Sequence, residues 1–184
     1  MNSPDLVSLS TIERPIDVRK TMYLASPLGF ADSTNAFMVD LAASLREIID
    51  VLNPWDDQRF AADFIALQSE DSVTARLARL AEINRELGQA NAAAIDSADG
   101  VIAILDGVDV DSGTAAEIGY AHALGKRVYG LRTDFRLAGD NHGAIVNLQV
   151  QYFIEASGGT IVSTVADLLQ TIETWASENV GDKA

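Results

Sequence analysis

The chain has 184 residues, of which 48% are hydrophobic, a formal net charge of −14 and no cysteine. Its length predicts one domain that can bury a sheet under helices on both faces. The negative charge argues against DNA, RNA and anionic membranes as partners. The lack of cysteine excludes disulfides and thiolate chemistry, and it fits a reducing cytoplasm, where we expect the protein to be. No apolar stretch approaches the roughly 20 residues of a membrane span.

The N-terminal part predicts a strand, a helix and a second strand. Residues 1–14 are polar and mixed in charge, and we expect a loose tail over 1–18. The first strand is expected at 20–25, where Pro27 soon ends it. A helix follows a cap at 33–35, and the residues that repeat along it at helical spacing are Phe37, Leu41, Leu45 and Ile48. A second strand is expected at about 49–52.

The central part predicts a long helix, a buried strand and a second, shorter helix. The long helix runs from Ser69 to a turn at 96–99, with Gly88 as a candidate interruption. The apolar residues expected on its inner side are Val73, Leu77, Leu80, Ile83, Leu87 and Ala94. The unbroken apolar run at 101–105 suits a strand buried on both faces of a parallel sheet. The shorter helix is expected at 112–124, ended by the glycine after it.

The C-terminal part predicts a short strand at 127–131 and a loop at 138–143. The apolar segment 146–154 suits either a helix or a strand, and the glycine pair at 158–159 predicts a turn. Residues 161–176 predict a closing helix, whose inward residues are Val165, Leu168, Leu169, Ile172 and Trp175.

Strands that alternate with helices predict right-handed parallel crossovers. The expected fold is therefore a single α/β domain over 19–178, followed by a polar tail at 179–184. Its sheet is doubly wound, Rossmann- or flavodoxin-like and mostly parallel, with helices on both faces.

Ligands of an open α/β sheet bind beyond the carboxyl ends of the strands. Here these ends are 23–30, 53–57, 106–117 and 132–136. Their aromatic, carboxylate and amide side chains suit a small polar molecule with a flat apolar part. The sequence has no glycine-rich dinucleotide motif or P-loop, its two histidines lack metal-ligand spacing, and no serine is marked as part of a triad. We therefore expect neither a metal nor a redox cofactor.

Glu117 requires an explanation, because it shares a helix face with small or apolar residues, namely Thr114, Ile118, Ala121 and Leu124. It lies about one turn from the positive end of its helix, which favours the ionised carboxylate. Burial raises the pKa of a carboxyl group, so a hydrogen-bonding partner is needed. A carboxylate held in this way is a competent nucleophile towards an anomeric carbon, and Asp111 is the nearest acidic group for the leaving-group proton.

The chain resembles the nucleoside 2-deoxyribosyltransferase family over most of its length, from Met22 to about Gly159. The resemblance rests on Tyr23-Leu24-Ala25-Ser26-Pro27-Leu28-Gly29-Phe30, on 99–105, on Asp111-x-Gly113-Thr114-x-x-Glu117-x-Gly119-Tyr120-Ala121 with Ala123-Leu124-Gly125-Lys126, and on Arg132-Thr133-Asp134-Phe135-Arg136. The run from Asp111 is fairly specific to this superfamily, and the first and last motifs narrow the resemblance further.

The resemblance implies that Glu117 attacks C1′ of a 2′-deoxynucleoside and expels the base, leaving a covalent deoxyribosyl ester. A second base then attacks this ester, with net retention. It also implies that Asp111 binds or protonates the base or the sugar hydroxyls, that Tyr23 hydrogen-bonds Glu117, and that Phe30 helps to sandwich the base. Asn91 falls where several relatives carry a carboxylate, and an amide there binds a hydroxyl or a base edge but cannot shuttle a proton.

The remaining candidates for substrate binding are Gly113, Trp55, Asp56 and Asn147, the last as the counterpart of a sugar-binding asparagine of the family. The implied partners are deoxynucleosides and free nucleobases, with no nucleic acid polymer and no membrane. Sites of this kind are often completed across subunits, so we expect a homo-oligomer.

Structural interpretations compete with these roles. They are a surface helix residue for Glu117, a helix cap for Asp111, a cap or turn for Asn91, strand or core filling for Tyr23 and Phe30, and a buried strand-end aromatic for Trp55. Arg132 and Arg136 suit a phosphate, but we expect a solvated pair or a salt bridge to Asp134.

Two rival functions remain open. An N-glycoside hydrolase acting on nucleosides or nucleoside 5′-monophosphates would use the same ester and let water replace the second base. Pro27 lacks an N–H and no basic residue stands at 26–30, which argues for a free 5′-hydroxyl. A non-catalytic nucleotide-sensing module on the same fold would bind a nucleoside and release no base.

Overall fold

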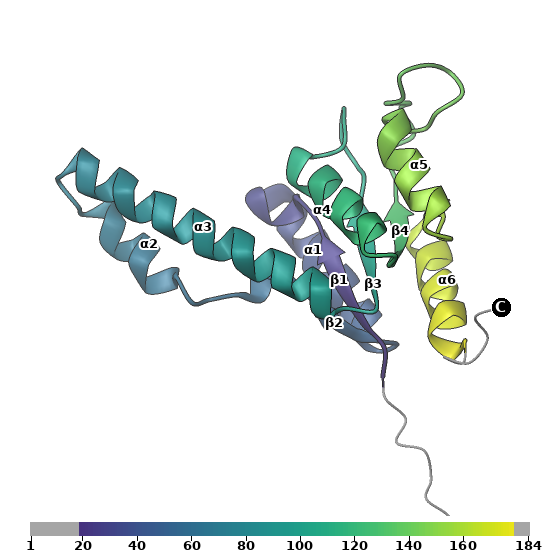
Figure 1. Cartoon of the computed structure of the whole chain (residues 1–184), viewed down its shortest axis with the longest axis horizontal. Helices are drawn as coiled ribbons and strands as arrows, with labels where there is room; N and C mark the ends of the chain where they lie inside the picture. The colour runs from purple at the N-terminus through teal and green to yellow at the C-terminus, as the bar shows by residue number, and fades with distance from the viewer. Residues whose placement is uncertain (1–18, 179–184) are drawn as a thin grey trace, which may run out of the picture.

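The computed structural model describes residues 19–178, and the two predicted tails lie outside these residues. The described chain folds into one five-stranded parallel sheet with helices on both faces (Figure 1). The strands are β1 (Thr21–Ala25), β2 (Asp50–Leu52), β3 (Gly100–Ile104), β4 (Arg127–Leu131) and β5 (Ile161–Val162). They lie in the order β2-β1-β3-β4-β5, and each neighbouring pair is parallel. This is the flavodoxin-like order, so the predicted fold class is confirmed.

The described residues form six α-helices. They are α1 (Asp32–Arg46), α2 (Ala61–Gln68), α3 (Val73–Ser97), α4 (Ser112–Ala123), α5 (Leu148–Ala156) and α6 (Val165–Ser177). All of them except α2 contribute to the packing against the sheet. Residues of α3, α4 and α5 form a buried cluster with one face of the sheet, and residues of α1 and α6 form a second cluster with the other face. Because successive strand residues point to opposite faces, Tyr23 joins the first cluster, while Met22 and Leu24 join the second.

The predicted strands agree with β1 to β4 to within one residue, but β5 differs from the prediction. The closing helix was expected from residue 161, whereas the chain first forms the two-residue strand β5 and α6 begins at Val165. Thr164 caps α6 by accepting a hydrogen bond from the backbone N–H of Asp167 at 3.1 Å. The ambiguous segment 146–154 is helical from Leu148 onward, because α5 runs from Leu148 to Ala156 and Asn147 caps it through its side-chain oxygen.

The long helix also differs from the prediction. It begins at Val73 behind a Ser72 cap and passes Gly88 without interruption, and a separate helix, α2, precedes it. Figure 1 shows α2 beside the outer half of α3, with both reaching away from the sheet. An Arg79–Asp63 ion pair of 3.0 Å joins them. Ile83 on α3 is buried as expected, but Val73 and Leu77 are exposed because no sheet lies opposite them.

The turn before β5 depends on glycine. A Cβ atom on Gly159 would stand 1.7 Å from the backbone oxygen of Val128, so only glycine lets the chain pass so close to β4. No helix within 19–178 is long and apolar enough to cross a membrane.

Candidate active site

The centre of the site is a hydrogen bond between β1 and α4. The Tyr23 hydroxyl donates to Oε1 of Glu117 at 2.6 Å. Tyr23 is 1% exposed and is fixed by the strand, whereas Glu117 is half-buried in the second turn of α4. Three of the residues predicted to share the Glu117 face, Thr114, Ile118 and Ala121, are buried, whereas Leu124 is exposed. The carboxylate that the sequence placed on an apolar face therefore has the partner that its burial requires.

Asp111 stands at the start of α4 and caps it. Its Oδ2 accepts a hydrogen bond from the backbone N–H of Thr114 at 3.0 Å. This confirms the capping interpretation, and the second carboxylate oxygen is not needed for that bond. Asp111 also lines the cleft that contains Glu117, so capping and contact with a ligand are compatible.

A cleft of about 320 Å³ opens beside the Tyr23–Glu117 pair. Its lining residues are Tyr23, Ser26, Phe30, Pro54, Trp55, Asn91, Asp111, Ser112, Gly113, Thr114 and Glu117. They come from the ends of β1 and β2, from α3 and from the start of α4, which is where an open parallel sheet binds ligands. Seven of the predicted site residues thus meet in one cavity large enough for a small molecule.

Two aromatic rings form one wall of the cleft. Phe30, in the 3-10 helix η1 (Leu28–Phe30), packs edge-on against Trp55, in η2 (Pro54–Asp56), with ring centroids 4.6 Å apart. The Trp55 indole Nε1 donates to the backbone oxygen of Ser26 at 2.9 Å. A Cβ atom on Gly29 would stand 2.1 Å from the Trp55 ring, so this glycine permits the contact. Phe30 is 78% exposed, which leaves most of the ring free to stack on a flat ligand.

The electrostatics of the pair follow from burial. Burial raises the pKa of Glu117, the hydrogen bond from Tyr23 lowers it, and the nearby negative charge of Asp111 raises it again. Burial and the adjacent Glu117 raise the pKa of Tyr23, so its phenol keeps its proton and donates. The result is a half-buried carboxyl group that the Tyr23 hydrogen bond orients and that lies beside a second acidic group. Such a pair suits nucleophilic attack coupled to proton transfer.

Two predicted binding residues lie outside this cleft. Asp56 is exposed, where it pairs with Arg46 and accepts from Asn53 Nδ2 at 3.2 Å. Asn147 caps α5, with Oδ1 accepting from the N–H of Gln149 at 3.0 Å. Asn91, by contrast, lies inside α3 and lines the cleft, so it is neither a cap nor a turn residue.

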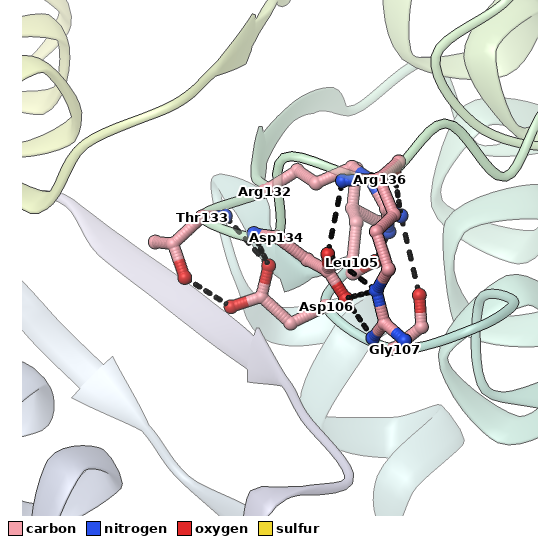
Figure 2. A network of polar contacts seen from close by, with 7 residues as sticks. All are labelled: Leu105, Asp106, Gly107, Arg132, Thr133, Asp134 and Arg136. Carbon is pink, nitrogen blue, oxygen red and sulfur yellow. Dashed lines mark hydrogen bonds and ion pairs between the residues drawn. The ribbon is translucent and has the colours of Figure 1, made fainter.

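The arginine motif after β4 divides into two parts (Figure 2). Arg136 pairs with Asp134, with Nε donating to Oδ1 at 2.9 Å, so the predicted salt bridge is confirmed. Arg132 is not a solvated partner of that pair, because it is buried and donates to backbone oxygens. Its backbone N–H donates to the backbone oxygen of Val162 at 2.9 Å, which extends the pairing of β4 with β5, and its side chain reaches the loop that follows β3 (Figure 2).

Four lining residues had not been singled out: Ser26, Pro54, Ser112 and Thr114. All four fall within the predicted strand ends, so the strand-end rule was the signal that covered them. Within residues 19–178, no group of three or more histidine, aspartate or glutamate side chains is arranged to hold a metal ion.

A sequence model of the nucleoside 2-deoxyribosyltransferase family matches residues 22–149. That span contains every residue that lines the cleft. No match was found among curated proteins.

Several solved structures are similar to this chain at low sequence identity, and three of them are enzymes, namely two 2-deoxyribosyltransferases and an N-glycosidase. A 2-deoxyribosyltransferase from Leishmania mexicana is 25% identical, with a TM-score of 0.50, and the match covers 71% of this chain and 85% of that one. The 2-deoxyribosyltransferase of Bacillus psychrosaccharolyticus is 21% identical, with a TM-score of 0.58 and coverage of 81% and 90%. A CMP N-glycosidase from Clostridium botulinum is 20% identical, with a TM-score of 0.51 and coverage of 84% and 99%. At these identities the last two establish similarity of fold.

Proposed function

We propose that this chain, which belongs to the nucleoside 2-deoxyribosyltransferase family of enzymes, transfers 2-deoxyribose from one nucleobase to another. The observation that carries the proposal is the half-buried Glu117 carboxylate, which receives the Tyr23 hydrogen bond inside a cleft that Asp111 also lines.

In the first step, Glu117 attacks C1′ of a 2′-deoxynucleoside. A bond forms between C1′ and a carboxylate oxygen, the C1′–N bond breaks with both electrons going to the base, and the base takes up a proton. In the second step, a nitrogen of another base attacks C1′ from the opposite side and releases Glu117. Two inversions give net retention. In this proposal Asp111, which lines the cleft, gives the proton to the leaving base and takes one from the incoming base, and Phe30 and Trp55 offer an apolar wall to the base ring.

The cleft supports a substrate with a free 5′-hydroxyl. Among the described residues that line it, none is lysine or arginine, and Asp111 and Glu117 make it acidic. A phosphate would meet these two carboxylates without a compensating cation. Asn91 can donate and accept a hydrogen bond at a hydroxyl or a base edge, but it does not exchange protons.

The second candidate function is hydrolysis of the same N-glycosidic bond. The same ester would form, and water would replace the second base. The observation that favours it is the CMP N-glycosidase of matching fold. Incubating deoxyinosine with and without adenine separates the two reactions, because transfer requires the acceptor base and hydrolysis does not. A binding module without activity would release no hypoxanthine in either case.

The test of the proposal is base exchange between deoxyinosine and free adenine, measured for the wild type and for Glu117→Ala. The wild type should form deoxyadenosine, and the variant should lose at least ~10³-fold in rate, as expected for removing a nucleophile. Glu173→Ala, on the exposed side of α6, is the matched control and should exchange at the wild-type rate. Exchange by Glu117→Ala at the wild-type rate would refute the mechanism.

A homo-oligomer and a cytoplasmic location are further parts of the proposal. Four apolar side chains of the α2–α3 arm are exposed in the single chain: Phe64, Ile65, Val73 and Leu77. Covering them with a second copy would remove apolar surface from water. Light scattering of the full chain should therefore give a mass of at least two chains, and a monomer mass would contradict this part.

A further inference from the structure

We propose that Arg132 and Asp106 are positioning residues that hold the loop between β3 and α4, and through it Asp111, in the geometry the reaction needs. This inference rests on the proposed function. It assigns a role to the arginine motif after β4, which lines no part of the cleft described above.

Arg132 fastens the loop from one side (Figure 2). Its guanidinium donates to the backbone oxygens of Leu105, Gly107 and Arg136, the last two through Nη2 at 3.2 and 2.6 Å. The residue is 3% exposed, and its Nε has no hydrogen-bond partner among residues 19–178. Burying a cation on carbonyl oxygens, with one donor left unsatisfied, is costly. This cost is understandable if the guanidinium of Arg132 is needed to join the loop after β3 to the loop after β4. Only arginine offers several hydrogen-bond donors in one fixed plane.

Asp106 fastens the same loop from the other side (Figure 2). Its Oδ1 accepts from the backbone N–H groups of Thr133 and Asp134 at 2.6 and 2.8 Å, and its Oδ2 accepts from the Thr133 hydroxyl at 2.6 Å. Arg132 and Asp106 therefore make reciprocal bonds, each from one loop to the backbone of the other.

The hydrogen bonds of Arg132 and Asp106, here called the clamp, lie close in sequence to Asp111. Three residues separate Gly107 from Asp111, and of these Val108 is 82% exposed whereas Val110 is buried in the core. Gly107 has a φ of +127°, a conformation that other residues rarely adopt. The loop therefore turns sharply at the residue whose backbone oxygen accepts from Arg132. Without the clamp, the loop would depend on the burial of Val110 to hold its position. Asp111, which caps α4, would then share the motion of the loop.

The experiment compares Asp106→Ala, Asp106→Asn and Arg136→Ala, each alone and combined with Asp111→Asn. The first readout is kcat/KM for base exchange, and the second is hydrogen–deuterium exchange of the amides of residues 105–115. Asp106→Asn keeps an acceptor for the two backbone N–H groups. Arg136→Ala removes an exposed side chain but not its backbone oxygen, so it is the control. Arg132→Lys tests the buried side, and the Asp106 variants keep the test decisive if that variant fails to fold.

Asp106→Ala should lower kcat/KM at least ~10-fold in the wild-type background and less than ~3-fold when Asp111 is already asparagine, because effects on one unit are not additive. Asp106→Asn should stay within ~3-fold of wild type, and Arg136→Ala should be unchanged. Hydrogen exchange at 105–115 should be faster in Asp106→Ala. Equal losses in both backgrounds, or unchanged exchange at 105–115, would overturn the inference. If the wild type transfers no deoxyribose, the proposed function fails, and the hydrogen exchange alone still decides this inference.

Discussion

Replacing Tyr23 with phenylalanine isolates the hydrogen bond at the centre of the site. The Tyr23 ring is buried in the core and its hydroxyl donates to Glu117 at 2.6 Å, so the variant keeps the packing and loses one donor. Burial already raises the pKa of Glu117, and the Tyr23 bond lowers it. The variant should therefore raise that pKa further and move the acid limb of the kcat/KM profile to higher pH.

The size of the effect follows from the kind of bond that is lost. A hydrogen bond to a charged acceptor contributes about 1.5–3 kcal/mol and a neutral one about 0.5–1.5 kcal/mol. Because Glu117 borders an open cleft, solvent screening places the charged bond in the lower half of its range, at about 1.5–2 kcal/mol. The loss in unfolding free energy should thus be smallest where Glu117 is protonated. It should grow by about 1 kcal/mol as the pH rises through the pKa of Glu117.

Chemical denaturation of the wild type and Tyr23→Phe between pH 4 and pH 8 measures this difference. The range stays below the titration of Tyr23, whose raised pKa would add its own dependence only at higher pH. Tyr129→Phe is the matched control, because Tyr129 is buried in the other cluster and accepts a hydrogen bond from Arg127 instead. A loss for Tyr23→Phe that is the same at both ends of the range, together with an unmoved acid limb, would refute the account of this pair.

Three further outcomes follow from the same structure. Glu117→Gln should raise the unfolding free energy at pH 7, because the folded protein no longer holds a half-buried charge near Asp111; the gain should shrink towards pH 4, since the raised pKa leaves wild-type Glu117 increasingly neutral there. Gly29→Ala should cost about 1–3 kcal/mol, because its Cβ would strike the Trp55 ring, and should raise KM more than it lowers kcat. Gly88→Ala should stabilise the protein by about 0.5–1 kcal/mol, because a Cβ there meets no atom within 4 Å.

Thermal or chemical unfolding checks all three, with base-exchange kinetics added for Gly29→Ala. A stability gain for Glu117→Gln that is constant with pH would contradict the charge argument. Wild-type KM in Gly29→Ala would mean that the aromatic wall does not touch the base. A destabilised Gly88→Ala would show that α3 is not a regular exposed helix at that point.

The sequence predicted the sheet well because its strands are bounded by clear signals. The run at 101–105 has no polar residue and lies under helices on both faces, as such runs do. The strand β5 was missed because its two apolar residues continue directly into the apolar pattern of α6, and only the Thr164 cap separates them. The outer half of α3 was misread because periodicity shows which residues share a face and not what lies opposite that face.

The cleft could be predicted in outline and not in detail. The strand-end rule brought Ser26, Trp55 and Asp111 to one edge, whereas Asn91 and the Tyr23–Glu117 bond came from the family resemblance. Asp56 was predicted from its position at a strand end, and Asn147 from the family resemblance. Their side chains instead pair with Arg46 and cap α5, and such local competition cannot be read from spacing.

Tyr23 and Glu117 are 94 positions apart in the chain. During synthesis the phenol leaves the ribosome long before the carboxylate is made, and the two meet only after the intervening strand has entered the sheet. A truncated product that stops before the start of α4 therefore lacks the Glu117 carboxylate, and a longer product that fails to dock β3 beside β1 carries this carboxylate without its hydrogen-bond donor. The Tyr23–Glu117 hydrogen bond thus reports that the central strand has entered the sheet.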